Sequence, residues 1–195
     1  MIRGTLSFSH ALIAAVLLLT GCKDDQAMGK ADPTTLDREA VGHYCGMIVA
    51  DHPGPKGQIF VEGRIDPYWF TSVRDTIAFT LLPEEPKRIT GIYVNDTARI
   101  GDWEAPEMSS WIGAETAWYV IGSSRRGGMG AAETVPFKEK QQAAAFAEDF
   151  GGHVVAFSEI PTDYVLGDAG TEADQAHAHG MDMKNDGEPT MKHRH

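Results

Sequence analysis

The chain opens with a strongly apolar segment and then alternates between short apolar stretches and polar, turn-forming ones. Arg3 precedes an apolar run over residues 6–19, which is short for a membrane span and typical of an export signal. The run ends in the motif LTGC, the pattern of a bacterial lipoprotein cleavage site, and its cysteine is Cys22. We therefore expect residues 1–21 to be a signal peptide, Cys22 to carry a lipid anchor, and residues 22–35 to form a tether.

The next segment, residues 36–100, has the pattern of two strands, a helix and a third strand. The two strands flank a loop rich in proline and glycine, so we expect a hairpin with a long loop. An Asp-Pro pair then starts a helix with an apolar stripe at helical spacing, and Pro83 stops it. The expected elements are strands over 43–50, 58–62 and 88–96 and a helix beginning at Asp66.

The same order of elements recurs in residues 101–166. A strand over 118–121 and a weak strand over 131–135 flank a glycine-rich turn. Pro136 then opens a helix that two glycines terminate, and a last strand covers 153–160. Two such ββαβ units predict an α+β fold in which each sheet presents one face to one helix.

The last segment, residues 167–195, is poor in apolar residues, so we expect it to be disordered. Its histidines and methionines could capture copper weakly as a secondary site, or the segment could simply be a solubilising end. These residues are His177, His179, Met181, Met183, Met191, His193 and His195.

Composition and charge narrow the classes of function. With 42% hydrophobic and 23% charged residues the chain should be globular. A formal net charge of −11 argues against a nucleic-acid partner and suits the capture of cations. The two cysteines matter more: if Cys22 is lipidated, Cys45 has no partner within the chain. An unpaired cysteine in an exported protein indicates intermolecular pairing or a reactive thiol.

Cys45 is accompanied by thioether side chains. On a strand, His43, Cys45 and Met47 would share one face, with Cys45 and Met47 about 6.6 Å apart. A flat strand cannot easily bring all three to one metal, so either Gly46 bends the strand or a third ligand comes from elsewhere. Met129, within a glycine-rich turn, is the best candidate for that ligand. A thiolate with thioethers is a soft donor set, which selects Cu(I).

Other interpretations of these residues stay open. Met47 could be a core residue of a strand and Met129 an exposed loop residue, because methionine often only fills gaps. His52 could add a borderline ligand or simply be solvated. The sequence has no spacing typical of an acid–base pair, a nucleophile elbow or a phosphate loop.

The chain also resembles the NosL family, accessory lipoproteins of nitrous oxide reductase maturation, across nearly all of the expected mature body. The segments that carry the resemblance are CGM at 45–47, DHPGPK at 51–56, QIF at 58–60, YVND at 93–96, YVIGS at 119–123, MG at 129–130, VPF at 135–137, FAE at 146–148 and GG at 151–152.

The resemblance implies a Cu(I) chaperone that delivers copper to the reductase apo-protein for its copper–sulfide centre, in cooperation with an ABC-type membrane assembly complex. It implies two homologous ββαβ units, similar in topology to organomercurial lyase. It also places the family's soft ligands on Cys45, Met47 and Met129. The protein should face the periplasm from a lipid anchor, and Lys23 after the anchor cysteine slightly favours the outer membrane.

Our leading hypothesis is therefore a Cu(I) carrier that is not an enzyme. One alternative is a thiol- or metal-dependent enzyme of the organomercurial-lyase fold, although such chemistry would want a second cysteine or an acid beside Cys45. The other alternative is a docking subunit of a membrane assembly complex, in which the metal is incidental.

Overall fold

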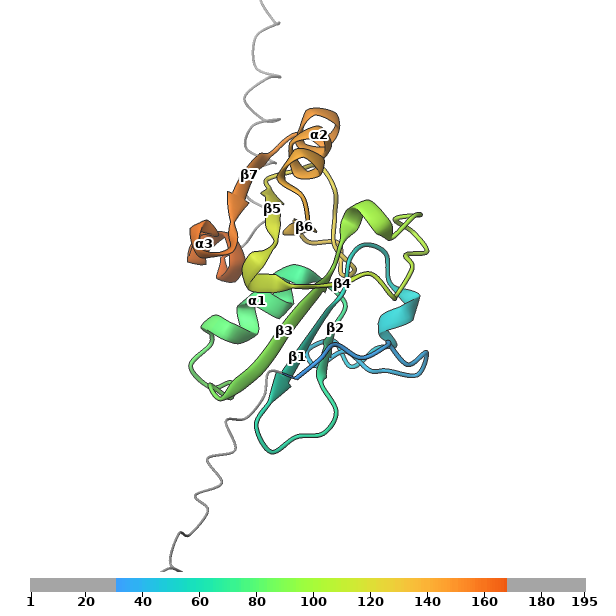
Figure 1. The fold of residues 1–195 in the computed structure, drawn as a ribbon, viewed down its shortest axis with the longest axis vertical. Helices are drawn as coiled ribbons and strands as arrows, with labels where there is room; N and C mark the ends of the chain where they lie inside the picture. The colour runs from blue at the N-terminus through green and yellow to red at the C-terminus, as the bar shows by residue number, and fades with distance from the viewer. Residues whose placement is uncertain (1–30, 168–195) are drawn as a thin grey trace, which may run out of the picture.

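The computed structural model describes residues 31–167, which form an elongated body with one β-sheet above the other (Figure 1). The expected signal peptide, the anchor Cys22 and the His/Met-rich segment after residue 167 lie outside the described residues. Within residues 31–167, no helix has the length and apolar character needed to cross a membrane. The mixture of sheets and helices confirms the predicted α+β class.

The larger sheet is antiparallel and has the strand order β2-β1-β3-β4. Helix α1 (Val73–Leu81) follows β2 and leads into β3. It begins at Ser72, whose hydroxyl oxygen accepts the N–H of Asp75 at 3.0 Å. The strands are β1 (Gly57–Val61), β2 (Tyr68–Phe70), β3 (Ile89–Asn95) and β4 (Trp111–Gly113).

The smaller sheet is also antiparallel and has the order β6-β5-β7. Its strands are β5 (Trp118–Ile121), β6 (Val135–Phe137) and β7 (His153–Ala156). Helix α2 (Lys140–Phe150) packs on this sheet, and the short helix α3 (Thr162–Leu166) contacts α1. Short 3-10 helices connect the elements: η1 (Val49–Asp51), η2 (Thr97–Arg99), η3 (Ala114–Thr116) and η4 (Phe157–Glu159).

Helix α1 lies at the centre of the body because two apolar clusters meet on it. Phe79 packs with Phe70 of the larger sheet. Val73 and Ile77 belong to a second cluster that also contains Tyr119 of β5 and Val165 of α3. Buried apolar contacts of this kind fix the two sheets relative to one another. Loops from both halves can therefore hold a defined geometry where they meet.

The predicted strand over 43–50 is wrong. The chain turns there, because Gly46 has a φ of +66°, a left-handed conformation that a strand cannot contain. The N–H of Gly42 donates to the carbonyl of Met47 at 2.8 Å and closes the turn. The predicted long-loop hairpin is wrong as well, since β1 pairs with β2 and β3.

Both predicted helix starts are also too early. The residues after Asp66 form β2, because Tyr68 and Phe70 pair with β1. Helix α1 therefore begins only at Val73. Pro136 lies in β6, at the edge of the smaller sheet, where a proline is tolerated because its missing N–H would face away from the neighbouring strand. The predicted helix ends are right: α1 stops before Pro83 and α2 stops at Gly151.

The expected division into units of residues 36–100 and 101–166 stays a prediction. In sequence order, β1, β2, α1 and β3 precede β5, β6, α2 and β7. Strand β4, which lies after residue 100, pairs with β3 and so extends the first sheet.

Candidate metal site

Cys45 lies in a tight turn attached to the edge of the larger sheet. Val41 bridges Ile48 across the base of this turn, and the N–H of His43 donates to the carbonyl of Trp69 in β2 at 2.7 Å. Cys45 is a free, half-buried thiol. We call residues 42–47 the cysteine turn.

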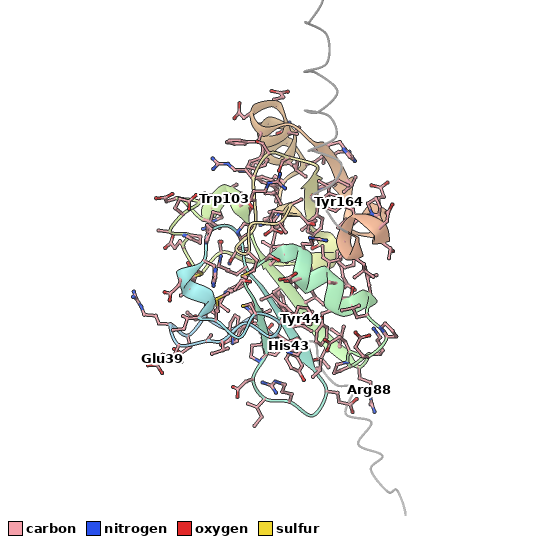
Figure 2. All side chains as sticks on the ribbon, turned by 180° about the vertical axis from the view of Figure 1, so that it is seen from behind. Glu39, His43, Tyr44, Arg88, Trp103 and Tyr164 are labelled. Atoms are coloured by element: carbon pink, nitrogen blue, oxygen red, sulfur yellow. The ribbon has the colours of Figure 1, made fainter. Side chains whose placement is uncertain are left out.

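His43 does not share a face with Cys45 in the way that the predicted strand required. Its ring lies 4.5 Å from the Tyr68 ring and 5.5 Å from the Phe79 ring, centroid to centroid. Its Nε2 lies 3.0 Å from Oε1 of Glu85. Figure 2 shows His43 beside Tyr44, and their ring centroids are 4.7 Å apart. The ring of His43 therefore packs in an aromatic cluster, and its Nε2 pairs with the Glu85 carboxylate.

The Tyr44 hydroxyl belongs to the same cluster. Partial burial, and then the hydrogen bond and negative charge of Glu85, raise the pKa of Tyr44 well above its ordinary value. The phenol therefore stays protonated at neutral pH and acts as a hydrogen-bond donor. His43 and Tyr44 thus both have a partner in the Glu85 carboxylate.

The methionines at the two predicted ligand positions are both accessible. Met47 ends the cysteine turn, and its exposed fraction is 41%. Met129 lies in the turn over residues 127–130, which the N–H of Gly130 closes by donating to the carbonyl of Gly127 at 2.8 Å. The exposed fraction of Met129 is 49%. We call residues 127–130 the glycine turn. Neither methionine is a core residue, so the alternative that Met47 is a core strand residue is wrong, whereas the description of Met129 as an exposed loop residue agrees with the structure.

The two turns meet at Thr71, the residue after β2. Its hydroxyl lies 3.9 Å from Sγ of Cys45. Its carbonyl oxygen lies so close to Gly128 that an added Cβ there would stand 2.5 Å from it. Only glycine permits this approach, which explains part of the glycine content of the turn. Cys45 and the glycine turn are therefore close neighbours in space, although the chain separates them by more than eighty residues.

His52 faces the same junction. Its Nδ1 lies 2.9 Å from the carbonyl oxygen of Gly128, the residue before Met129. A carbonyl oxygen only accepts, so Nδ1 carries the hydrogen and the lone pair of the neutral ring is on Nε2. Histidines that bind metals are commonly held in this way, with the second ring nitrogen donating to a carbonyl. The backbone bond thus prepares His52 to offer Nε2 to a metal.

A lysine and a glutamate are buried beneath these loops. Lys56 is fully buried and donates from Nζ to the carbonyls of residues 52, 53 and 54 at 2.6–2.7 Å. Glu133 is also fully buried, and its Oε1 accepts the backbone N–H groups of Arg74 at 3.0 Å and Thr134 at 2.8 Å. Within residues 31–167, its Oε2 has no hydrogen-bond partner, and it lies against Gly127.

Burial shifts the pKa values of both groups. Desolvation lowers the pKa of Lys56 to about 8, an effect that the negative charge of Glu133 opposes. Desolvation raises the pKa of Glu133 to about 7, against the two backbone hydrogen bonds and the charge of Lys56. The sequence analysis did not single out Lys56, Glu133 or Thr71. For Lys56 the reason is that a lysine in a Pro/Gly-rich loop normally points into solvent.

Cys45 and His52 bring a thiol and an imidazole to the two sides of this junction. Among residues 31–167, no three His, Cys, Asp or Glu side chains gather closely enough to hold a metal ion. The Thr71 hydroxyl instead contacts the Cys45 thiol, the His52 imidazole bonds to the glycine turn, and Met47 and Met129 belong to the two turns that meet there. This set suits a soft ion better than Ca²⁺ or Mg²⁺, which prefer oxygen ligands.

The fold and this junction define a small α+β protein with a free, half-buried thiol and an exposed methionine in each of two neighbouring turns. The chain belongs to the NosL family, because the model of that family matches residues 33–165. The resemblance read from the sequence is thereby confirmed.

The chain is similar to two copper-binding lipoproteins of this family. NosL from Achromobacter cycloclastes is 47% identical over 154 residues, which are 78% of this chain and 79% of the relative. NosL from Stutzerimonas stutzeri is 37% identical over 152 residues, 76% of this chain and 78% of the relative. The fold is similar to the crystal structure of the copper chaperone NosL from Shewanella denitrificans. That comparison has a TM-score of 0.62 and 35% identity, and it covers 68% of this chain and 97% of the other.

Proposed function

We propose that this protein is a non-catalytic Cu(I) carrier, in which Cys45, Met47 and Met129 are the sulfur ligands. The observation that carries the proposal is the contact of Thr71 with both Cys45 and Gly128, which brings the thiol next to the turn of Met129. The names of the relatives, a copper-binding lipoprotein and a copper chaperone, support copper as the cargo.

The chemistry of these ligands suits a carrier. Binding converts the Cys45 thiol into a thiolate, which gives affinity and releases one proton to solvent. Thioethers are neutral and weaker donors, and both methionines are accessible. An acceptor protein can therefore add one of its own ligands as one thioether leaves. The copper stays monovalent throughout, so the transfer needs no oxidant or reductant.

His52 is the best candidate for an additional ligand. Its Nε2 carries the lone pair, because Nδ1–H is bound to the Gly128 carbonyl. Imidazole is a borderline donor that also accepts copper. The carrier site would then combine sulfur with one nitrogen.

The destination and the setting of the carrier follow from the family resemblance. We propose that it delivers copper to the nitrous oxide reductase apo-protein for its copper–sulfide centre, together with an ABC-type membrane assembly complex. Lipidation of Cys22 would hold the body at the periplasmic side of a membrane, with the outer membrane slightly favoured. Two homologous ββαβ units similar in topology to organomercurial lyase would complete the family pattern.

A carrier fits the surroundings of Cys45 better than the thiol-dependent enzyme does. A thiol-dependent enzyme would need a general acid or a second thiol beside its nucleophile. The side-chain hydrogen bond that Sγ accepts within the described residues comes from the Thr71 hydroxyl, which is a poor general acid. The Glu85 carboxylate is engaged by His43 and Tyr44, the two residues that precede Cys45.

The ligand assignment is tested by substituting each sulfur in the full-length protein. Cys45→Ser should abolish tight Cu(I) binding in competition with a chelator and leave the circular dichroism spectrum unchanged. Met47→Leu and Met129→Leu keep the side-chain volume, and each should weaken binding by roughly tenfold. Met108→Leu is the matched control, because Met108 lies in neither turn, and it should bind as the wild type does.

X-ray absorption on the Cu(I)-loaded protein then counts sulfur and nitrogen neighbours. Three sulfurs, falling to two in each Met→Leu variant, are expected. Wild-type affinity in Cys45→Ser would overturn the assignment of the thiol. Normal copper delivery by a variant that lacks all three sulfurs would instead support the docking-subunit alternative.

A further inference from the structure

Lys56 occupies an unusual place for a lysine in a loop. Lys56 is fully buried. Its ammonium group donates to three consecutive backbone carbonyls, those of His52 at 2.7 Å, Pro53 at 2.7 Å and Gly54 at 2.6 Å. An ammonium has three N–H donors, so each has one acceptor. The loop over residues 52–54 is thus wrapped around a single buried cation.

The same loop is fastened to the larger sheet at its far end. The backbone N–H of Lys56 donates to Oδ1 of Asn95 at 3.0 Å, and the N–H of Asn95 donates back to the Lys56 carbonyl at 3.0 Å. Asn95 is the last residue of β3 and is fully buried. The N–H of Gly54 donates to the carbonyl of Trp103 at 2.7 Å. Lys56 therefore joins the loop to a rigid strand.

His52 is consequently held at two points. Its carbonyl accepts from the Lys56 ammonium, and its ring donates to the carbonyl of Gly128 in the glycine turn. Without the ammonium, three carbonyls would lose their donor, and the backbone of residue 52 could rotate. The ring would then no longer be fixed against the glycine turn.

Stability alone does not account for this arrangement. A buried ammonium costs free energy of desolvation, and an apolar side chain of similar volume often gives a fold of equal or greater stability. The Glu133 carboxylate offsets part of that cost by its charge. What an apolar side chain could not supply is the set of three donors that fixes the loop.

We infer that Lys56 is a positioning residue for the metal site: its buried ammonium gathers the carbonyls of residues 52–54 and so fixes the direction of Nε2 of His52. The inference rests on the proposed function for its effect on copper, but its effect on the ring of His52 exists in the copper-free protein. Lys56 itself does not touch the ion.

The test compares Lys56→Met with Lys87→Met in the full-length protein. Lys87 is an exposed lysine that also donates to backbone carbonyls, those of Thr80 and Leu82, away from the metal site. In copper-free protein, nitrogen NMR of the His52 ring should show Nδ1 protonated in the wild type and in Lys87→Met. In Lys56→Met the two tautomers should mix. Cu(I) affinity should fall 10- to 100-fold in Lys56→Met only, with one nitrogen neighbour lost from the X-ray absorption spectrum.

A measurement on the wild type covers the case in which Lys56→Met fails to fold. An ammonium with three carbonyl acceptors in a buried site should give a slowly exchanging NMR signal, with proton contacts to residues 52–54. Absence of that signal would overturn the inference, as would an unchanged His52 ring in a folded Lys56→Met.

These outcomes are distinguishable from failure of the proposed function. If Cys45→Ser keeps wild-type affinity while the His52 tautomer still depends on Lys56, the carrier site is misassigned and the positioning role stands. If Cys45→Ser loses copper while the His52 tautomer is the same in Lys56→Met as in the wild type, the carrier site stands and Lys56 serves only the fold.

Discussion

Two histidines flank Cys45 in the sequence, and their surroundings differ in kind. His43, two residues before the cysteine, lies among aromatic rings and pairs through Nε2 with Glu85. His52, seven residues after it, donates through Nδ1 to a backbone carbonyl and lies on a loop built around buried Lys56. Figure 2 shows His43 far from Trp103, whose carbonyl accepts from the loop of His52.

The difference shows that the partner of a histidine decides its availability to a metal more than its distance from a cysteine along the chain. A carboxylate on Nε2 occupies the nitrogen that reaches farthest from the backbone. A carbonyl on Nδ1 leaves that nitrogen free and sets its lone pair. Nε2 of His43 is therefore engaged by a carboxylate, whereas the His52 ring makes its hydrogen bond at Nδ1, as the proposed ligand role requires.

The largest contrast is expected in the pH dependence of stability, because among residues 31–167 the fully buried carboxylate, that of Glu133, lies beneath the loop of His52 and the glycine turn. Desolvation raises the pKa of Glu133 from 4.5 to about 7 in the folded protein. Below pH 4.5 both the folded and unfolded states hold the proton, so Glu133 costs nothing. Between pH 4.5 and 7 the unfolded state ionises first, and the free energy of unfolding falls as pH rises. The full cost is about 3 kcal/mol above pH 7.

Glu133→Gln should remove this free-energy cost of ionisation, because a glutamine side chain does not ionise. Urea unfolding of the variant and the wild type from pH 4.5 to 8 should show the variant gaining stability relative to the wild type as pH rises. Glu104→Gln, at an exposed position, is the control and should follow the wild-type slope. A constant difference between Glu133→Gln and the wild type over this range would mean that Glu133 is ionised throughout.

The next contrast is in copper affinity. His52→Ala should weaken Cu(I) binding 10- to 100-fold, the usual effect of losing a ligand or its close support, whereas His43→Ala should change it less than threefold. Chelator competition at fixed pH measures both. Equal losses in the two variants would remove the distinction between a structural and a binding histidine.

Several elements were predictable because their signals are local. The β-branched and aromatic run over 118–121 is a strand as predicted, and the segment 88–96 contains β3. Pro83 and Gly151 end their helices because proline and glycine act on the backbone wherever they occur. The candidate sulfurs Cys45, Met47 and Met129 could likewise be named from residue type alone, and their role as ligands stays a prediction.

The remaining features depend on contacts between distant residues. The composition of residues 43–50 suits a strand, yet the backbone hydrogen bonds to Trp69 and the conformation of Gly46 make it a turn. Phe70 fits the helical spacing of the segment that follows, but pairing with β1 places it in a strand. The burial of Lys56 could not be predicted, because its acceptors are backbone carbonyls, which every residue has.

The smallest contrast is in stability at neutral pH. His43→Ala removes a ring that contacts several aromatic side chains and the partner of Glu85, so it should lower the free energy of unfolding by about 1 to 3 kcal/mol. His43→Phe keeps the ring contacts and should recover roughly half of that loss. His153→Ala, at an exposed position, should change stability by less than about 0.5 kcal/mol. If urea unfolding gave the same stability for His43→Ala as for His153→Ala, the aromatic contacts and the Glu85 pair of His43 would add nothing measurable to the fold, and the backbone hydrogen bonds of His43 and Gly42 would be enough to hold the cysteine turn.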